Sequence, residues 1–375
     1  MNRTRSVLTL LCGALLLCAL VAASAPPAAE AGSVDRALTK LRKQKDISKS
    51  RARWANRQYS KAVKTRTKLR RGVKRLRGKQ RAKRRAQAKA RVRALNWQIR
   101  NVESMARRGR ISRTRVTPLF TTLSVNAAWF RSNGTRPAGT DRRFKGSRII
   151  YQYFPGSGWQ FHPLSNFSKL NAIWTVDTPP SRRAQRAYAK ELIRWGVKRG
   201  KGLVWEYYFN YQGSPAPWIS AISQGAAIQS LARVGERFNN KGFKRAAVRG
   251  SYAFDTPAPN GLRVRRDGGF HYLGYSGNKR LIILNMFLSS LDGLRSFALI
   301  TDNRRGRYLY QRGLDAARTV TPKFDTGSWS LYSLDGKKSD AHYHQLTISF
   351  LDKICDYTGE DVFCKTRDRF KSYAK

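Results

Sequence analysis

The segment LIILNMFLSSLDGLRSF (residues 281–297) contains the pattern that decides the fold of the C-terminal part of the chain. Apolar side chains recur at the spacing of one face of an α-helix. This face consists of Leu284, Phe287, Leu291 and Leu294. The other face is polar and consists of Asn285, Ser289, Asp292 and Ser296. The polar face is either exposed to solvent or, in an inner helix, lines a wet cleft with Asn285 as a candidate substrate contact.

A second segment, ISAISQGAAIQSLARVGERF (219–238), has the same periodicity. Gln224 heads an apolar stripe that continues with Ile228, Leu231, Gly235 and Phe238. Its amide is either a hydrogen-bonded core group or a donor that lines a cavity. Across 179–375, helical segments of ordinary length alternate with glycine and proline breaks. This alternation is typical of an antiparallel α/α barrel or toroid.

Residues 116–178 have a different texture, with short runs of β-branched and aromatic residues between glycines, prolines and asparagines. The runs are TLSVNAAWF (122–130), SRIIYQYF (147–154), GWQFHPLS (158–165) and LNAIWTV (170–176). Such runs predict strands, and hence a small β-rich region. The predicted fold class is therefore α+β and mainly α: a basic N-terminal helical segment, the β-rich region, and the barrel-like or toroid-like C-terminal domain.

The block 33–115 is strongly basic, with 32 lysines and arginines against three acidic residues. Lysine, arginine and alanine favour helix, so the block is predicted to form one or two long helices or a loose hairpin. It has no clean heptad repeat, which argues against a stable coiled coil. Because its charges repel one another, partial disorder until a polyanion binds is the alternative.

The first 25 residues have the pattern of a secretory signal peptide. Arg3 and Arg5 precede an apolar run, and Ala23-Ser24-Ala25 forms a small-residue cleavage site. Its removal leaves Cys355 and Cys364, which we expect to form one disulfide in an oxidising compartment. The sequence therefore predicts a secreted or cell-surface protein.

The whole chain carries 75 lysines and arginines against 22 acidic residues, a net charge of +53. Such an excess favours a polyanionic partner and binding that weakens with salt. Nucleic acid would bind this charge in a test tube, but the export signal and the lack of a base-reading motif argue against it as the physiological partner. An anionic polysaccharide, or a cell-surface polyanion bound by 33–115, fits better.

The C-terminal part also resembles a known family in several ordered pieces. They are WISAISQGAAIQSLAR (218–233), YLGYSGNKRLIILNMFLSSLDGL (272–294), FDTGSWSLYSL (324–334), HYHQLTISFL (342–351) and RFKSYAK (369–375). In order and approximate spacing these pieces resemble the C-terminal domain of D-glucuronyl C5-epimerases, enzymes of heparosan-type polysaccharides. The resemblance implies a β-rich region followed by an α/α barrel-like domain, and C5 inversion of D-glucuronate to L-iduronate within a polymer, without an organic cofactor. It also implies a tendency to form homodimers.

The family's functional tyrosines correspond to Tyr275, Tyr332 and Tyr343. The resemblance thereby implies that these three residues are catalytic. Four family positions differ here: a glutamate is Gly274, a proline is Ser276, an arginine is Asp335 and a second histidine is Thr347. The absence of the glutamate affects the details of the expected proton transfer. The absence of the arginine affects the expected recognition of a substrate carboxylate or sulfate.

Tyrosines suit this chemistry because the C5 hydrogen of a uronate lies next to a carboxylate. Its removal creates a dianion-like intermediate, so a donor must neutralise the carboxylate, and inversion needs a proton-transfer group on each ring face. A phenol can be the acid when neutral and the base when ionised. We expect a basic cleft to lower the phenol pKa and favour the phenolate. Tyr275 and either Tyr332 or Tyr343 would form the opposed pair, and the third would orient the substrate.

Structural interpretations of the same residues stand beside the catalytic one. Tyr343 shares a helical stripe with Leu346, Phe350 and Ile354 and could be a core residue, and Tyr275 and Tyr332 could be turn residues. Trp218 either stacks on a sugar or packs at a helix start. His344 is a candidate hydrogen-bond partner of the substrate or of a phenol. With His342, His162 and His271 the only other histidines, no metal site is expected.

Three other functions remain open. A polysaccharide lyase begins with the same proton abstraction and then expels the 4-linked sugar. A glycoside hydrolase needs an opposed carboxylate pair, for which Glu206, Asp255, Asp267 and Asp292 are candidates by residue type alone. A noncatalytic surface protein would use the basic block to hold an anionic glycan.

Overall fold

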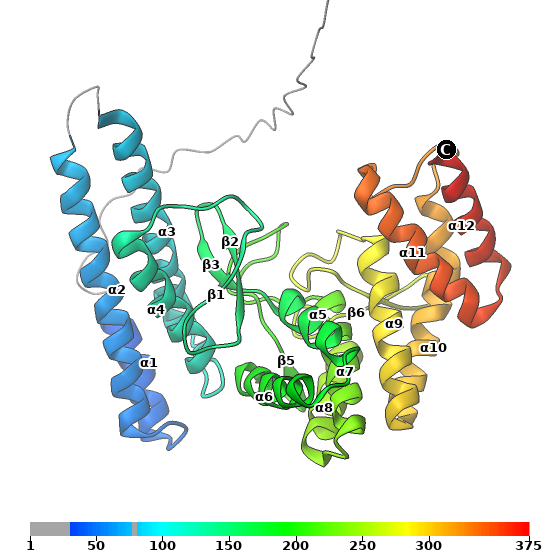
Figure 1. Cartoon of the computed structure of the whole chain (residues 1–375), viewed down its shortest axis with the longest axis horizontal. Helices are drawn as coiled ribbons and strands as arrows, with labels where there is room; N and C mark the ends of the chain where they lie inside the picture. The colour runs from blue at the N-terminus through cyan, green and yellow to red at the C-terminus, as the bar shows by residue number, and fades with distance from the viewer. Residues whose placement is uncertain (1–30, 77–80, 375) are drawn as a thin grey trace, which may run out of the picture.

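The computed structural model describes residues 31–76 and 81–374, and the predicted signal peptide lies outside these ranges. The elements form a crescent in which helices dominate and the sheets are small (Figure 1). The prediction of a mainly helical α+β fold is therefore confirmed. In the described part of the chain, no helix combines the length and apolar character that a membrane span requires.

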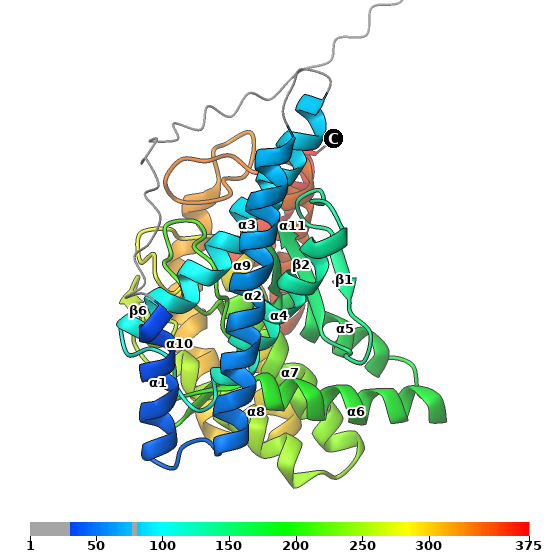
Figure 2. The same cartoon turned by 90° about the vertical axis from the view of Figure 1, so that its left-hand side faces the viewer.

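The basic N-terminal block is mainly helical in its described residues. It forms α1 (Ala31–Lys43), α2 (Lys49–Arg75) and α3 (Ala82–Arg107). Figure 2 shows α2 and α3 side by side as a long hairpin. Alanines such as Ala55 and Ala62 are fully buried and let the helices approach, while most lysines and arginines remain exposed. Since Leu95 and Ile99 join the main hydrophobic core, these helices are packed against the rest of the protein.

The prediction of strands in 116–178 is right at its centre and wrong at both ends. The run at 122–130 lies in helix α4 (Val116–Ser132), and the run at 170–176 falls mostly in helix α5 (Pro163–Trp174). Helix α4 is buried on several sides, so its apolar residues show no single stripe. Between these helices, β1 (Asp141–Arg143), β2 (Ile150–Phe154) and β3 (Gly158–Phe161) form an antiparallel sheet in the order β1-β2-β3.

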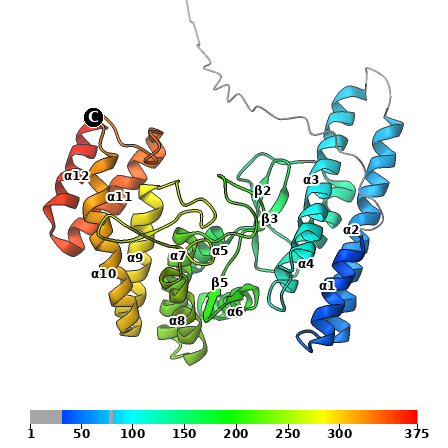
Figure 3. The same ribbon diagram turned by 180° about the vertical axis from the view of Figure 1, so that it is seen from behind.

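The C-terminal helices form an arc of antiparallel pairs, best followed in Figures 1 and 3. The inner helices are α5, α7 (Ala221–Arg237), α9 (Leu284–Thr301) and α11 (Ala341–Thr358), each in contact with the next. The outer helices are α6 (Pro179–Trp195), α8 (Lys241–Asp255), α10 (Arg304–Val320) and α12 (Asp361–Tyr373). Helix α9 is thus an inner helix, one of the two interpretations that its apolar and polar faces allowed. On the polar face, Asp292 accepts a hydrogen bond from Tyr357 of α11.

Two glycines allow α7 and α9 to pack closely. A Cβ added at Gly293 would lie 2.6 Å from the backbone of Gly225, and one added at Gly225 would lie 3.1 Å from the Cα of Ser290. No side chain fits between the helices there, so their backbones are nearly in contact. This close packing fixes the position of α7 relative to α9. Both helices begin beside the site described below.

Short hairpins and one 3₁₀ helix connect the helical pairs. They are β4 (Val197–Arg199) with β5 (Gly202–Val204), β6 (Arg263–Arg266) with β7 (Gly269–Tyr272), and η3 (Thr321–Phe324). Just after β5, the fully buried Glu206 bonds Arg115 at 2.7 Å and Arg199 at 2.6 Å. Burial alone would raise the pKa of Glu206, but the two arginines hold it at about 2. This cluster joins the N-terminal helices to the arc.

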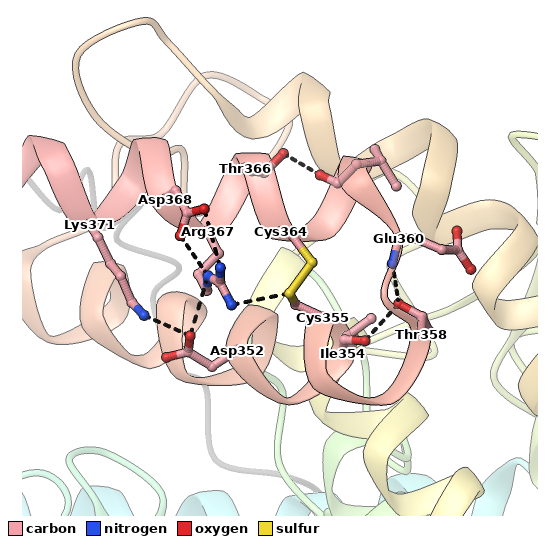
Figure 4. The surroundings of a disulfide bond; sticks show 11 residues. Asp352, Ile354, Cys355, Thr358, Glu360, Cys364, Thr366, Arg367, Asp368 and Lys371 are labelled. Carbon is pink, nitrogen blue, oxygen red and sulfur yellow. Dashed lines mark hydrogen bonds and ion pairs between the residues drawn. A yellow bond between two sulfur atoms is a disulfide. The ribbon is translucent and has the colours of Figure 1, made fainter.

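Cys355 of α11 and Cys364 of α12, the pair identified in the sequence, form a disulfide (Figure 4). Arg367 donates to Cys355 Sγ at 3.1 Å and pairs with Asp368 at 2.7 Å. Lys371 pairs with Asp352 across the two helices at 2.7 Å. These contacts fasten the last helical pair of the arc.

Candidate active site

Tyr275 lies on a loop that backbone hydrogen bonds hold against the start of α7. Ser276 N donates to Ile219 O at 3.0 Å, and Ile219 N donates back to Ser276 Oγ at 3.1 Å. Gly277 N donates to Ser214 Oγ at 3.1 Å. The Tyr275 side chain is only 8% exposed. Its ring is therefore held in one position by its own loop and by the loop at 214–219.

Tyr332 lies on a second loop, fastened to the residues that precede α9. Leu334 N donates to Ile282 O at 3.1 Å, and Ser333 forms an isolated β-bridge with Ile283. The loop closes on itself because Tyr332 N donates to Lys337 O at 2.7 Å. Tyr332 is half-buried, so its ring is partly accessible from solvent.

Tyr343 comes from the first turn of α11. Asp340 caps this helix by accepting a hydrogen bond from Tyr343 N at 2.8 Å. The Tyr343 side chain is half-buried, like that of Tyr332. The stripe of apolar residues that follows it in α11 packs into the core, but Tyr343 itself lies at the open end of the helix.

The structure brings these three tyrosines together. The ring centres of Tyr332 and Tyr343 are 4.8 Å apart, and the ring planes meet at 58°. The hydroxyls of Tyr275 and Tyr332 interact through a hydrogen bond that raises the pKa of Tyr275 and lowers that of Tyr332. This interaction therefore favours ionisation of Tyr332 over ionisation of Tyr275. Residues far apart in sequence thus form one cluster, which we call the tyrosine cluster.

Sequence comparison gives the same part of the chain a family. Residues 199–372 match the family model described as D-glucuronyl C5-epimerase C-terminus. This part of the chain belongs to the D-glucuronyl C5-epimerase family. All three residues of the tyrosine cluster fall within the matched range.

Two curated relatives align with about half of the chain. An uncharacterized protein of Methanocaldococcus jannaschii is 24% identical over 183 residues, which are 47% of this chain and 59% of that protein. The D-glucuronyl C5-epimerase of Caenorhabditis elegans is 28% identical over 180 residues, 43% of this chain and 29% of that enzyme. The chain therefore spans less than two thirds of either relative. Among solved structures, a cellobiose 2-epimerase from Bacillus thermoamylovorans superposes with a TM-score of 0.46 and 11% identity, over 76% of this chain and 74% of that one.

The pKa values of the tyrosine cluster differ from the expectation for a basic cleft. Burial raises the pKa of Tyr332 to about 12, and repulsion from Tyr343 adds to it. Burial also raises the pKa of Tyr343 and, together with repulsion from neighbouring phenols, moves the pKa of Tyr275 well above its ordinary value. The prediction that basic surroundings lower these pKa values is therefore wrong for the protein alone. Lys337 Nζ, 5.1 Å from the centre of the Tyr332 ring, does not outweigh burial.

Trp218 packs against Tyr275 of the tyrosine cluster. It is 3% exposed, its Nε1 donates to Phe209 O at 2.6 Å, and its ring lies 5.2 Å from that of Tyr275. Of the two roles that the sequence allowed for Trp218, the structure supports packing at the helix start. A buried ring has no free face on which a sugar could stack. Asn285, in the first turn of α9, is 4% exposed, and its side chain makes no hydrogen bond to another described residue. Asn285 therefore remains a candidate substrate contact.

Two predicted substrate contacts are instead core residues. Gln224 is 1% exposed, and its Nε2 donates to Leu203 O at 2.9 Å and to Gly250 O at 3.0 Å. His344 is also 1% exposed; Nε2 contacts Phe370 O at 2.9 Å and Nδ1 contacts Ser330 Oγ at 2.7 Å. Both side chains are almost fully buried, and the amide nitrogen of Gln224 and both ring nitrogens of His344 are engaged within the protein, so neither side chain is accessible to a saccharide.

One residue near the cluster was missed by sequence reasoning. Tyr211 is 40% exposed, its ring centre lies 5.8 Å from that of Tyr275, and its charge would influence all three clustered phenols. It belongs to the aromatic run VWEYYFNYQG (204–213), which was the available signal. In the same run, Tyr207 stacks on Trp218 at 4.1 Å. Tyr211 thus forms the exposed edge of the site.

The positions that differ from the family have local structural explanations. A Cβ added at Gly274 would lie 2.6 Å from Met286 Sδ, so Met286 fills the space next to this backbone. Asp335 closes its own turn by accepting from the Ser333 hydroxyl. Neither position supplies a charged group that points to substrate in this arrangement.

The carboxylates considered for a hydrolase are all engaged in ion pairs. Each is engaged by cations: Glu206 by Arg115 and Arg199, Asp255 by Arg263 and Arg305, Asp267 by Arg266 and Lys323, and Asp292 by Lys353. A general acid needs a raised pKa, whereas the arginine and lysine partners lower the pKa of Glu206 and of Asp267. Across the two described ranges, no group of three or more His, Cys, Asp or Glu side chains is arranged to hold a metal ion.

Proposed function

We propose that the protein inverts C5 of D-glucuronate within an anionic polysaccharide by tyrosine-mediated proton transfer. The observation that carries the proposal is the tyrosine cluster: three phenols from separate segments of an epimerase-family domain meet at one partly open site. The chain's large positive charge fits a polyanionic substrate. Heparosan, a glucuronate polymer, is the substrate class that the family resemblance favours.

Within this reaction, the hydrogen bonding of the cluster suggests separate roles. The interaction of the two hydroxyls raises the pKa of Tyr275 and lowers that of Tyr332, so the Tyr332 phenolate is the better stabilised of the two, and Tyr332 is assigned as the base that removes the C5 proton. Tyr275 holds its own proton and supports that phenolate. Because these two hydroxyls are in contact, they reach the same face of a sugar ring. Tyr343, the other half-buried phenol, is then assigned to return a proton on the opposite face.

The substrate carboxylate needs its own partner during proton removal, since negative charge develops next to it. Lys337 lies on the Tyr332 loop, and Lys279 and Arg280 follow Tyr275 on its loop. All three are exposed, so they are available to neutralise the carboxylate. Asn285 is assigned as a neutral donor to the same sugar.

Incubation with heparosan in heavy water tests the proposal. Proton NMR should show loss of the C5 proton signal and appearance of iduronate, without new unsaturated chain ends absorbing in the ultraviolet. Such ends would identify a lyase instead. A parent protein that neither exchanges the C5 proton nor forms iduronate on any glucuronate polymer contradicts the epimerase and leaves glycan binding as the function.

Two variants distinguish the assigned roles. Tyr343→Phe should still exchange the C5 proton of glucuronate with deuterium but form at least about tenfold less iduronate, since only reprotonation on the second face is lost. Tyr275→Phe should slow exchange and inversion together, because it removes support from the Tyr332 phenolate. Tyr308→Phe, on an exposed tyrosine of α10, is the matched control. Equal loss of exchange and inversion in Tyr343→Phe would reject the assignment of opposite faces.

The basic helices α2 and α3 fit attachment to an anionic polymer at the cell surface. One hollow on α2, of about 430 Å³, is lined by Arg53, Arg57, Lys61 and Lys64. Export by the predicted signal peptide and formation of a homodimer remain predictions from the sequence. Together they describe a secreted epimerase that stays near its substrate.

A further inference from the structure

A basic groove lies at the end of the helical layer away from the tyrosine cluster. Its volume is about 920 Å³. Six cations line it: Lys198, Lys201, Lys241, Lys244, Arg245 and Arg249. Helix α9 relates the two places, because it begins at Leu284 beside the Tyr332 loop and ends at Thr301, which also lines the groove. Its 18 residues span roughly 27 Å at 1.5 Å per residue.

Two elements bring these cations together. Lys198 and Lys201 come from the β4–β5 hairpin, and the other four come from α8. Gly202 allows the hairpin to lie directly on the helix, since a Cβ there would be 3.5 Å from Tyr252 Cβ and 3.6 Å from Arg249 O. The concentration of charge thus follows from the packing of the hairpin on α8.

The positive charge of the groove is not balanced by acidic residues in its lining. No carboxylate lines it, and among the described residues only Lys244 of the six has an ion-pair partner, Glu236 at 2.6 Å. The carboxylate of Asp255 at the end of α8 is already engaged by Arg263 and Arg305. Five exposed cations therefore face solvent without compensation, and their repulsion favours the arrival of an anion.

The lining also has an apolar part. Val248 and Tyr252 lie among the cations, and the Arg305 guanidinium sits 4.1 Å from the centre of the Tyr252 ring. Aromatic and aliphatic surface beside cations suits an acidic sugar, which offers both C–H faces and carboxylates. A phosphate backbone would require the cations alone.

We propose that this groove binds a second stretch of the acidic polysaccharide whose uronate reacts at the tyrosine cluster. The inference rests on the proposed function for the identity of the polymer. A single sugar cannot reach both places across the length of α9, but one long chain can. The groove therefore holds the polymer near the cluster and raises the affinity for long chains over short ones by making the second contact intramolecular.

Charge-neutral variants test the groove by direct binding. The triple variant Lys201→Gln, Lys241→Gln and Arg245→Gln removes three exposed cations and keeps their aliphatic parts. The control triple, Lys169→Gln, Arg183→Gln and Lys190→Gln, removes three exposed cations of α5 and α6 outside the groove. Both change the net charge equally. With fluorescein-labelled long-chain heparosan at moderate salt, each groove contact is worth about twofold, so the groove triple should bind about eightfold more weakly. The control triple should stay within about twofold of the parent.

Kinetics give an independent readout. In the groove triple, KM for long heparosan should rise by about eightfold with kcat unchanged, while KM for a tetrasaccharide should not change. Equal weakening of binding by the two triples would overturn the proposal, because bulk charge alone would explain it. A larger groove-dependent loss for duplex DNA than for heparosan would overturn the polysaccharide assignment. If the parent shows no C5 exchange, the proposed function fails, while the affinity difference between the triples still decides whether the groove binds the polymer.

Discussion

The Glu206 cluster is fully buried at its carboxylate and the tyrosine cluster is partly buried, and the pKa values of the two clusters are shifted in opposite directions. Glu206 is fully buried between Arg115 and Arg199, and these partners hold its pKa at about 2. In the tyrosine cluster, by contrast, burial is the largest cause that acts on the pKa of each phenol, and it raises all three pKa values. The first cluster is charged and compensated, whereas the second is neutral and becomes charged only with difficulty.

This difference separates a structural role from a chemical one. A compensated charge lowers the energy of the folded state and changes little when a ligand arrives. A neutral phenol with a raised pKa is a weak acid, and its conjugate base is correspondingly strong, which suits abstraction of a weakly acidic C–H proton. The loops at 275 and 332 hold such groups together. Perturbed pKa values of this kind are concentrated at functional sites.

The largest effect is expected from Tyr332→Phe, because it removes the assigned base. Deuterium exchange at C5 of heparosan should fall by about 1,000-fold, within the range for loss of a general base. The ring and its packing remain, so the temperature of thermal unfolding should change little. Proton NMR in heavy water measures the first quantity and circular dichroism the second. A variant that keeps a tenth or more of parental exchange would remove Tyr332 from the base role.

The second effect concerns stability, and Glu206→Gln should produce it. The substitution leaves two buried arginines without their counter-charge, at a cost of about 3 kcal/mol in the free energy of unfolding near pH 7. The folded-state pKa is depressed, so the carboxylate's contribution is present above its ordinary pKa of 4.5 and is lost as pH falls toward 2. Urea unfolding at pH 7 and pH 3 should therefore show a gap between parent and variant that narrows in acid.

Asp302→Asn is the matched control for that measurement. Asp302 also pairs with an arginine, Arg307, but its side chain is 92% exposed, and asparagine tolerates its left-handed backbone at φ 47°. The control should unfold like the parent at both pH values. A gap for Glu206→Gln that is unchanged between pH 7 and pH 3 would contradict an ionised Glu206 as the source of stability.

Much of the fold could be predicted from periodicity, and the exceptions have a physical cause. The stripes in 219–238 and 281–297 are one-sided enough to identify α7 and α9. Helix α4 is buried on several sides, so Leu119, Phe120 and Leu123 do not fall on one stripe, and its β-branched residues imitated a strand. The central strands β2 and β3 were recognisable because glycine and proline bound them.

The site was less accessible to sequence reasoning than the fold. The tyrosine cluster could be named only through the family resemblance, because Tyr275, Tyr332 and Tyr343 lie on loops and a helix start without any local motif. Gln224 and His344 could not be distinguished from ligand contacts, since their partners Gly250 and Phe370 are 26 residues away in each case. Polar residues within an apolar stripe form their hydrogen bonds with partners that only the tertiary structure brings near.

The rate of exchange should also rise steeply with pH. Tyr332 must lose its proton to act, and its pKa is about 12. Below that pKa, the ionised fraction grows about tenfold for each pH unit, so exchange at saturating heparosan should increase about 100-fold from pH 7 to pH 9. Tyr343→Phe, which keeps the base, should show the same slope of exchange. A plateau near neutral pH would indicate that substrate binding shifts the pKa of Tyr332 strongly downward or that another group is the base.

The smallest effect tests whether Lys337 stabilises the ionised form of Tyr332, as Arg115 and Arg199 stabilise the ionised form of Glu206. Lys337 Nζ lies 5.1 Å from the centre of the Tyr332 ring and favours the phenolate over the phenol. An exposed cation–ring interaction is worth about 0.7 kcal/mol, so Lys337→Gln should slow exchange about threefold below pH 9. The loss should shrink at high salt, because the lysine is exposed and screened. Lys338→Gln is the control, since Lys338 is equally exposed on the same loop but does not lie over the ring. If both lysine variants lose the same activity, the general charge of the loop acts on the substrate, and the Tyr332 phenolate receives no specific support from Lys337.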